Sequence, residues 1–316
     1  MQYRQLGHTG LQVSELCFGV LPLGPLQADI SVDDGAELML AAMENGVNFF
    51  DTAQSYQTYP HLAKALRHYP EKIVIATKST ATDYAGMEKA ICEALQALSV
   101  EYIDIFHLHA ARVGVNLLEE RAGAWQCLLD YQQKGYIRAV GVSTHNAKLV
   151  AKLADVPELD VIFPLVNKAG LGILEGNVAD MQEAMAKAVA GGKGIYAMKA
   201  LAGGALLDDY LAAINFVRDI PGVASVAIGM VKMAELELNL RLFQAYEIEP
   251  ERLRHLKNGK EWGLMKSLCK GCGCCVAACP NQDLSLLEGK STVDKQKCIL
   301  CGYCVPTCPE FAIRLR

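Results

Sequence analysis

The chain has 316 residues, of which 52% are hydrophobic and 21% charged, a composition typical of a globular protein with a large buried core. A formal net charge of −5 leaves no overall basic surface, so we expect no nucleic-acid partner. No apolar run reaches the roughly 18 residues of a membrane span, and the N-terminus has no secretion-signal pattern. The sequence therefore predicts a cytoplasmic protein without a membrane partner.

Short apolar runs alternate with helix-like segments along most of the chain. The predicted strands are 15–20, 48–53, 72–78, 102–109, 139–143, 161–166, 194–199 and 225–229. The amphipathic segments between them include 31–45, 87–98, 118–134, 176–190, 206–218 and 233–243. Strands joined by helical crossovers form a parallel sheet, and eight such repeats predict an α/β fold of the (β/α)8 TIM-barrel type. Gly7 and Gly10 predict a tight turn, and hence an N-terminal hairpin before the barrel.

The pattern changes after Phe243, where polar and charged residues replace the alternation. We divide the chain into a barrel at 1–245, a helical linker at 246–265 and a small C-terminal domain at 266–316. The linker contains Trp262, Leu264 and Met265, which would be exposed unless they packed against another surface. We therefore expect the linker to pack on the barrel.

Three consecutive predicted strands end in polar residues. Asp51 ends one strand and is followed in the loop by Tyr56, whereas Lys78 and His109 end the next two strands. The carboxyl ends of parallel barrel strands meet at one rim, where this fold assembles its catalytic sites. Since a buried carboxylate is costly without a partner, Lys78 is a suitable ion-pair partner for Asp51. The four residues predict a catalytic group at this rim.

In this order on successive strands, the four residues resemble the Asp, Tyr, Lys and His tetrad of the aldo-keto reductase family. Residues 3–14 resemble the opening hairpin of that family, and Gly141-Val142-Ser143 resembles its fifth strand. The resemblance covers about residues 1–245. It implies the reduction of an aldehyde or ketone, or the oxidation of an alcohol, with NADPH as the hydride donor.

The resemblance also implies a role for each residue. Lys78 would lower the pKa of Tyr56, Asp51 would hold Lys78, and Tyr56 would exchange a proton with the substrate oxygen. His109 would hydrogen-bond the same oxygen. His107 lies on the same strand face, but it is farther from the rim, so we predict a buried, hydrogen-bonded core residue. We expect Arg112, in the loop after His109, to be a solvated surface residue.

The nicotinamide contacts match the family less closely. The family usually has Asn after the serine of the fifth strand and Gln on the sixth, and both bind the carboxamide. This chain has Thr144 after Ser143, and it has Phe163 or a neighbour at the Gln position, with Asn167 as a nearby polar residue. The predicted ring contacts are therefore Ser143, Thr144 and Asn167.

On the phosphate side, Gly229 precedes the last barrel helix, whose N-terminal amides suit an anion. Lys232 and Asn239 resemble family positions that contact the adenosine phosphate. No Gly-x-Gly-x-x-Gly motif follows the first strand, so a Rossmann fold has no support.

The chain has 12 cysteines, and all except Cys17, Cys92 and Cys127 lie between Cys269 and Cys308. They form two Cys-x2-Cys-x2-Cys-x3-Cys-Pro runs, which is the spacing of bacterial ferredoxins. Zinc also binds four thiolates, but its sites usually use paired Cys-x-x-Cys units. Cys274 lies outside the motif and is a predicted free thiol, and we expect the three scattered cysteines to be small buried apolar residues.

The two runs resemble a two-cluster ferredoxin domain, in which the last cysteine of each run completes the cluster of the other. The resemblance implies two 4Fe–4S clusters in a small α+β domain. The first would have the ligands Cys269, Cys272, Cys275 and Cys308, and the second Cys298, Cys301, Cys304 and Cys279. Because the domain has little apolar core, we expect it to be disordered without the clusters.

Hydride transfer moves two electrons, whereas each cluster moves one. The leading interpretation is an NAD(P)H-dependent oxidoreductase that acts on a small carbonyl or alcohol substrate and whose clusters exchange electrons with a redox protein partner. The clusters would otherwise be structural or form a docking site. A flavin would connect the two kinds of transfer, but the sequence has no flavin fingerprint. The alternatives are an electron-transfer protein whose barrel is a scaffold without nicotinamide, and a lyase or isomerase with the same acid and base residues.

Overall fold

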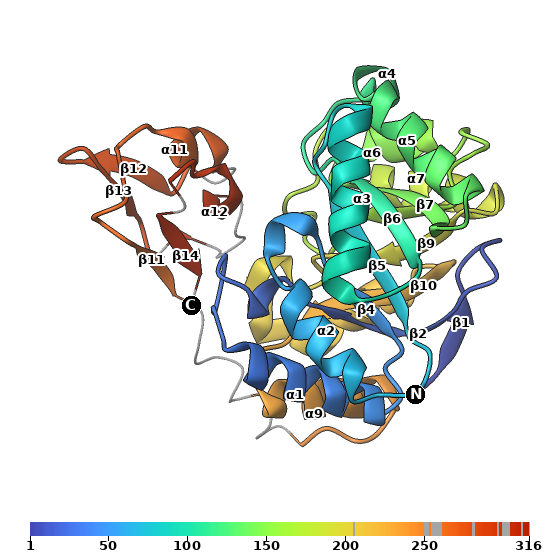
Figure 1. The fold of residues 1–316 in the computed structure, drawn as a ribbon. Coiled ribbons are helices and arrows are strands. Elements are labelled where there is room, and N and C mark those ends of the chain that lie inside the picture. Colours follow the sequence, from blue (N-terminus) through green and yellow to red (C-terminus); the bar gives the residue numbers. More distant parts are fainter. Residues whose placement is uncertain are drawn as a thin grey trace.

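The computed structural model describes residues 1–204, 206–249, 253, 261–279, 282–295, 297–298, 304–310 and 312–315. Figure 1 shows a large barrel, coloured from blue to orange, and a small orange-red domain beside it. The N-terminal strand β1 and the small domain lie on opposite sides of the barrel in this view. The two parts are described in turn below.

The barrel is closed by eight parallel strands in the order β10-β3-β4-β5-β6-β7-β8-β9. All eight predicted strands are present and the barrel prediction is confirmed. The strands are β3 (Leu16–Gly19), β4 (Phe49–Asp51), β5 (Val74–Ser79), β6 (Ile103–His109), β7 (Ile137–Thr144), β8 (Val161–Pro164), β9 (Gly194–Ala197) and β10 (Val223–Gly229).

An outer layer of helices covers the strands, as the parallel connections require. The helices of the barrel are α1 (Val32–Glu44), α2 (Tyr59–Arg67), α3 (Tyr84–Leu98), α4 (Leu117–Glu120), α5 (Ala122–Gln133), α6 (Ala147–Leu153), α7 (Val178–Ala190), α8 (Tyr210–Arg218) and α9 (Met233–Phe243). The helix expected at 118–134 is divided into α4 and α5, because Arg121 between them has a non-helical φ of −122°. Ser31 caps α1 by accepting a hydrogen bond from the Asp34 amide, as its sequence position indicates.

The N-terminal hairpin closes one end of the barrel. Strands β1 (Tyr3–Gln5) and β2 (Gln12–Ser14) pair antiparallel across a turn in which Gly7 and Gly10 have positive φ. Leu6, Leu11 and Val13 are buried in one cluster with inward-facing strand residues. The end of the barrel that carries the strand C-termini is therefore the one left for a site.

The small domain consists of two antiparallel strand pairs and two short helices. Strand β11 (Trp262–Leu264) pairs with β14 (Ile313–Leu315), and β12 (Leu284–Leu287) pairs with β13 (Lys290–Val293). The helices are α11 (Cys274–Ala278) and α12 (Cys304–Thr307). This arrangement confirms the predicted small domain that contains both strands and helices.

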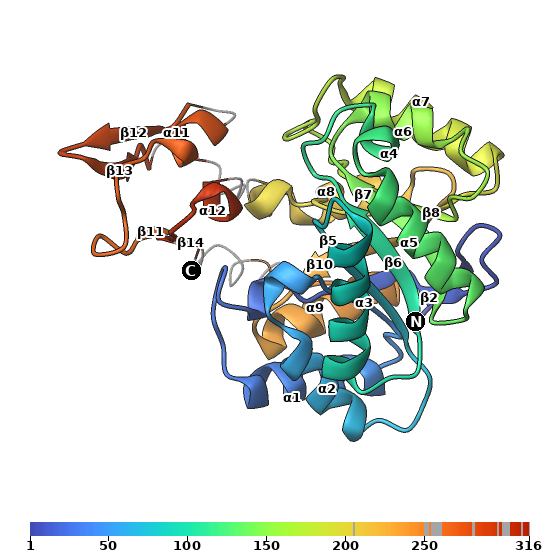
Figure 2. The same ribbon diagram turned by 45° about the horizontal axis from the view of Figure 1, so that its top comes forward.

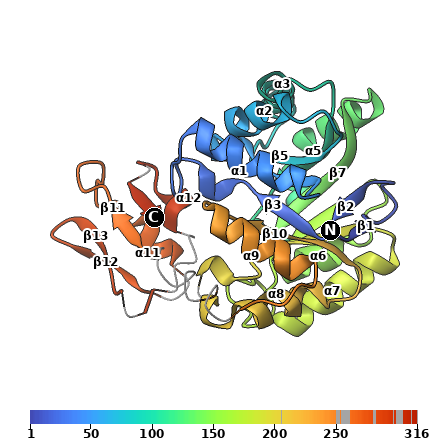
Figure 3. The ribbon, with the colours of Figure 1, turned by 90° about the horizontal axis from the view of Figure 1, so that it is seen from below.

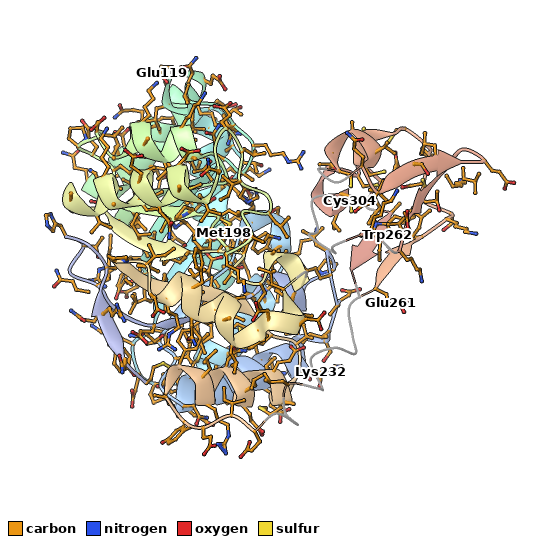
Figure 4. The ribbon with its side chains drawn as sticks, turned by 180° about the vertical axis from the view of Figure 1, so that it is seen from behind. Glu119, Met198, Lys232, Glu261, Trp262 and Cys304 are labelled. Atoms are coloured by element: carbon orange, nitrogen blue, oxygen red, sulfur yellow. The ribbon has the colours of Figure 1, made fainter. Side chains whose placement is uncertain are left out.

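The predicted helical linker is wrong at both of its described ends, since 246–249 have no helical structure and 262–264 form a strand. Residues 262–264 form β11 because β14 supplies their hydrogen-bond partners. Trp262 and Leu264 pack in the small domain, while Ile248 and Leu253 pack against the barrel core. The rest of the linker prediction, at 250–252 and 254–260, lies outside the described residues. Figure 4 labels Trp262 and Cys304 in the small domain and Met198 in the barrel.

Among the described residues, the contacts between the small domain and the barrel include a shared apolar cluster and a hydrogen bond. Leu26, in the loop before α1, is 7% exposed and belongs to the same apolar cluster as the small domain's buried cysteines. Arg112 donates a hydrogen bond of 2.9 Å from Nη2 to the Ala278 carbonyl oxygen. Arg112 is an exposed surface residue as expected, but its guanidinium also bonds a residue 166 positions away in the sequence. Figures 2 and 3 show the small domain beside the barrel from two further directions.

Candidate active site

Neighbouring strands bring the four predicted catalytic residues to one rim. Asp51 ends β4, and Lys78 and His109 lie at the ends of β5 and β6, which follow it around the barrel. Tyr56 belongs to a short 3-10 helix, η2 (Gln54–Tyr56), in the loop directly after β4. Because parallel strands place their carboxyl ends together, the barrel itself gathers these side chains.

The side chains form one contacting group. Lys78 Nζ lies 2.6 Å from Asp51 Oδ1 and 2.8 Å from the Thr52 carbonyl oxygen. The same ammonium lies 4.9 Å from the centroid of the Tyr56 ring. The rings of Tyr56 and His109 meet edge to face, with centroids 6.1 Å apart. This geometry joins an ion pair to a tyrosine and a histidine.

Burial controls the electrostatics of the group. Lys78 and Asp51 are 1% and 4% exposed. Burial lowers the pKa of Lys78, but the Asp51 carboxylate, Tyr56 and Cys17 together outweigh this effect and leave that pKa raised. Burial also raises the pKa of Asp51 and of Tyr56, while the Lys78 ammonium opposes both rises. Lys78 therefore favours the Tyr56 phenolate as expected, but burial leaves the pKa of Tyr56 above its ordinary value.

His109 is held in its neutral form. Burial and then the Lys78 ammonium lower the pKa of His109 to about 3. Its carbonyl oxygen accepts a hydrogen bond of 3.1 Å from Arg121 Nη1, which fixes the end of β6. At neutral pH this imidazole can donate or accept a hydrogen bond without carrying charge.

Three residues under the tetrad were not among the predicted site residues. Tyr196 Oη donates a hydrogen bond of 2.9 Å to Asp51 Oδ2, and His107 Nε2 lies 2.7 Å from Tyr196 Oη. The Tyr196 and Phe163 rings are stacked, with centroids 3.9 Å apart and an interplanar angle of 12°. His107 is fully buried, so the prediction of a hydrogen-bonded core histidine is confirmed. The available signal for Tyr196 was its inward-facing position in the predicted strand 194–199.

A cavity of about 140 Å³ lies at this rim. Asp51, Tyr56 and Phe163 line it, together with Ala227, Ile228 and Gly229 from the end of β10. The segment after β9 also lines it, namely Met198, Lys199, Ala200, Leu201, Gly203, Gly204 and Leu207. The catalytic tyrosine candidate thus faces a space of small-molecule size.

One buried polar atom lies next to Phe163 in the strand register, and its hydrogen-bonding capacity fits a nicotinamide carboxamide. Ser143 is fully buried, and its Oγ has no hydrogen-bond partner among the described residues. In the strand register Ser143 lies between His109 on β6 and Phe163 on β8. A carboxamide would supply the missing partner, and the Phe163 ring would offer an apolar face. The ring end of the site therefore fits the cofactor that the family resemblance implies.

The other predicted cofactor contacts, on the ring side and on the phosphate side, are placed differently. Thr144 Oγ1 accepts a hydrogen bond from the Asn146 amide, and the Asn167 side chain bonds both backbone groups of Leu171. Asn239 is 1% exposed and accepts a hydrogen bond of 2.8 Å from Tyr210 Oη. These three side chains form hydrogen bonds within the fold. Of the six predicted cofactor contacts, only Gly229 lines the cavity.

The predicted phosphate site is also partly occupied by the protein. Lys232 is exposed immediately before α9, as Figure 4 shows. The Val231 amide donates a hydrogen bond of 2.7 Å to Glu235 Oε2, so a carboxylate of the chain already takes this donor. An anion at this helix start would have to use the remaining donors.

The small domain brings together the first predicted set of cluster ligands. Cys269, Cys272, Cys275 and Cys308 line one small cavity, although the last of them comes from the second run. The Ser291 amide donates to Cys269 Sγ at 3.5 Å and the Ala312 amide to Cys308 Sγ at 3.3 Å. Amide donors stabilise thiolates, and thiolates are the form that binds iron. Four thiols around one cavity are the donor set of a 4Fe–4S cluster, although among the described residues no three metal-ligating side chains lie close enough to hold a single metal ion.

The second set is described only in part. Cys279, Cys298 and Cys304 are partly or fully buried, and the Asp283 amide donates to Cys279 Sγ at 3.3 Å. The fourth predicted ligand, Cys301, lies outside the described residues. Among the other cysteines, Cys274 is an exposed free thiol, as predicted.

The scattered cysteines differ from one another. Cys17 and Cys127 are buried as expected, whereas Cys92 is exposed. The prediction of burial for Cys92 is wrong because this position of α3 faces outward, with Sγ 3.8 Å from Tyr131 Oη.

We predict that acid destabilises the barrel through its buried histidines. Burial lowers the pKa of His107, His109 and His145 below the ordinary value of 6.5. The unfolded chain then binds protons at pH values where the folded chain does not, so the free energy of unfolding falls as pH drops below about 6.5. We expect a loss of roughly 3 kcal/mol for the three groups between pH 6.5 and 5.5, measured by urea unfolding. His109→Gln should remove about a third of this loss, and an unchanged pH dependence would contradict the assignment.

The comparisons with known proteins agree with both parts of the structure. The sequence model of the Aldo/keto reductase family matches residues 15–219, and that of a 4Fe-4S dicluster domain matches residues 262–309. L-galactose dehydrogenase of Arabidopsis thaliana is 27% identical, over 57% of this chain and 60% of that protein. 6-Dehydroglucose reductase of Novosphingobium aromaticivorans is 30% identical, over 48% of this chain and 54% of that protein. The chain therefore spans less than two thirds of the length of these two relatives.

Solved structures show the same fold. A structure from Pseudomonas aeruginosa that is assigned to the aldo-keto reductases superposes with a TM-score of 0.67 and 27% identity, over 77% of this chain and 95% of that one. Among the described residues, no helix combines the length and hydropathy needed to cross a membrane. The extent of the family match settles the classification: the chain belongs to the aldo/keto reductase family and carries a C-terminal 4Fe-4S dicluster domain.

Proposed function

We propose that the barrel catalyses the reduction of a small aldehyde or ketone, or the reverse oxidation of an alcohol, with Tyr56 as the general acid or base. The observation that carries this proposal is the Lys78–Asp51 ion pair, whose ammonium lies 4.9 Å from the Tyr56 ring at the edge of the cavity. Similar proteins named as a sugar dehydrogenase, a sugar reductase and a methylglyoxal reductase support the same class of reaction.

Each tetrad residue has a chemical task in this proposal. Tyr56 Oη donates its proton to the carbonyl oxygen in reduction and accepts it back in oxidation. Lys78 stabilises the phenolate that remains, and Asp51 holds Lys78 in place. His109, whose pKa of about 3 keeps it neutral, orients the same oxygen by a hydrogen bond.

NADPH is the proposed hydride donor, since family membership and the ring end of the cavity both favour it. Ser143 would bind the carboxamide, and Phe163 and Tyr56 would bound the ring. When bound, the nicotinamide supplies the hydride that becomes the new C–H bond of the alcohol. The chain's own contribution is to place the ring, keep water away and move the proton at Tyr56.

We further propose two 4Fe–4S clusters, with the crossed ligand sets described above, that exchange electrons with the barrel site or a redox protein. The contacts of Leu26 and Arg112 support coupling, because they hold the small domain at the active-site rim. Arg112 follows His109 by three positions, and its partner Ala278 directly precedes the proposed ligand Cys279. The barrel loop therefore contacts the residue next to Cys279, one member of the proposed second ligand set.

One observation favours a second candidate function. The side chains of Thr144, Asn167 and Asn239 are engaged inside the fold, which leaves few polar contacts for a dinucleotide. An electron-transfer protein whose barrel no longer binds nicotinamide would have this pattern. Measured NADPH binding separates the two candidates.

The test is an anaerobic titration of the iron-replete protein with NADPH, followed by nicotinamide fluorescence and by the visible absorbance of the clusters. We expect saturable binding, and turnover when methylglyoxal is added as the carbonyl probe. Bleaching of the clusters would show that hydride electrons reach them. No binding at millimolar NADPH would contradict the hydride-donor proposal and favour the scaffold.

Ser143→Ala provides a specific check on the ring contact. The loss of one hydrogen bond of about 1 to 1.5 kcal/mol should weaken NADPH binding by roughly tenfold. Ser225→Ala is the matched control, because Ser225 is equally buried but bonds the Ser14 and Glu15 carbonyl oxygens instead. Equal effects of the two substitutions would remove Ser143 from the site.

A further inference from the structure

A chain of hydrogen bonds crosses the barrel interior beneath the active site. It runs from His107 Nε2 to Tyr196 Oη at 2.7 Å, and from Tyr196 Oη to Asp51 Oδ2 at 2.9 Å. Lys78 Nζ reaches the other carboxylate oxygen, Oδ1, at 2.6 Å. Asp51 is therefore held at both oxygens, by groups from β5 and β9 on different sides of the barrel.

The direction of every bond in this chain follows from proton counting. Tyr196 has one hydroxyl proton, and it goes to Asp51, because an ionised carboxylate only accepts. His107 must then donate from Nε2, so its neutral ring carries the proton there. Its Nδ1 has no hydrogen-bond partner among the described residues and faces Gly141, where a Cβ would lie 2.2 Å from it. All the donors consequently point toward Asp51.

Packing fixes Tyr196 in this position. Its side chain is fully buried, stacks on Phe163 at 3.9 Å and contacts the Phe49 ring at 4.8 Å. The stacked ring cannot turn away without breaking these contacts. Tyr196 does not line the cavity, whereas Phe163, which stacks on its ring, does.

We propose that Tyr196, supported by His107, is a positioning residue that keeps Asp51 ionised and aligned with Lys78. One part of this proposal rests on the proposed function, namely that a fixed Lys78 ammonium promotes proton transfer at Tyr56. The titratable groups that face Asp51 are Lys78 on β5, Tyr196 on β9, Cys17 on β3 and Tyr56 on η2. Lys78 alone among them carries positive charge, and Tyr196 supplies the second donor.

The test measures the titration of Asp51 directly. The carboxyl carbon of Asp51 is followed by NMR in protein labelled with carbon-13 aspartate, and Asp51→Asn identifies the signal. In Tyr196→Phe the stack remains but the donor is lost, so the Asp51 titration should move upward by about one pH unit, the size expected for a hydrogen bond to a charged group. A shift below about 0.2 units in a folded variant would overturn the proposal.

A matched control separates this effect from the general loss of a tyrosine hydroxyl. Tyr131→Phe removes a hydrogen bond of 3.0 Å to a carboxylate oxygen of Glu88, on the outside of the barrel. It should leave the Asp51 titration unchanged. If Tyr196→Phe does not fold, His107→Leu decides the question, since it removes the support of Tyr196 and should shift Asp51 in the same direction by less. No shift in folded His107→Leu would count against the proposal.

Kinetics distinguish failure of this proposal from failure of the proposed function. With NADPH and methylglyoxal, Tyr196→Phe should lower kcat about tenfold, the effect of about 1.4 kcal/mol, and leave KM unchanged. An Asp51 shift in a protein that reduces no carbonyl would support the positioning role and contradict the function. Normal turnover with an unshifted Asp51 titration would support the proposed function and contradict the positioning role of Tyr196.

Discussion

Tyr56→Phe should lower kcat for the carbonyl probe by between about 10² and 10⁴, because general acid–base catalysis contributes a factor of that size. The substitution removes the only proton donor that the proposed mechanism uses. The Phe ring can keep the position 4.9 Å from the Lys78 ammonium and the edge contact with His109. Folding and NADPH binding should therefore be retained.

Tyr59→Phe is the control for this experiment. Tyr59 lies three positions further along the chain, and its hydroxyl forms a buried hydrogen bond of 2.8 Å with Thr77 Oγ1. The Tyr59→Phe variant should keep a normal kcat and lose about 1 kcal/mol of folding stability. Full turnover by Tyr56→Phe would refute the catalytic assignment. Equal losses in both variants would show that the site depends on packing rather than on a proton donor.

Cys308→Ser should remove one cluster and leave the other, so that iron falls from about eight to about four atoms per chain if two 4Fe–4S clusters are present. Cys308 belongs to the second cysteine run, but it shares a cavity with Cys269, Cys272 and Cys275 of the first. Metal binding contributes on the order of 10 kcal/mol to the folding of small metal domains. We therefore also expect the small domain to become susceptible to proteolysis.

The matched variant is Cys274→Ser, because Cys274 is exposed and has no place in the motif. Its iron content and absorbance should remain normal. Iron measured on purified protein together with electron paramagnetic resonance of the reduced state distinguishes the outcomes. Unchanged iron in Cys308→Ser would contradict the crossed ligand set, and zinc in place of iron would contradict the cluster assignment itself.

The barrel could be predicted from the sequence because its signals are local. Each strand is an apolar run, and each crossover has helical periodicity, so the eight strands were identified without knowledge of their partners. The positions of Asp51, Lys78 and His109 at strand ends were also local facts, and parallel strands always bring such ends together. The meeting of these three side chains at the rim follows from their strand-end positions and from the parallel arrangement of the strands.

Contacts that depend on closure of the fold could not be predicted in this way. Tyr196 bonds Asp51 across 145 residues, and their strands β9 and β4 are not neighbours in the barrel. Residues 262–264 form a strand only because β14 pairs with them. In both cases the partner is distant in sequence, so propensity and periodicity near the residue carry no information about it.

The pairing of β11 with β14 has a consequence for biosynthesis. These strands join the two ends of the small domain, and Cys308, which completes the first proposed ligand set, lies just ahead of β14. The eight barrel strands and α9 precede this region, so a nascent chain can close its barrel while the small domain is still in the ribosome. Formation of the first proposed cluster therefore requires synthesis as far as Cys308, and the residues of all eight barrel strands have been made by then.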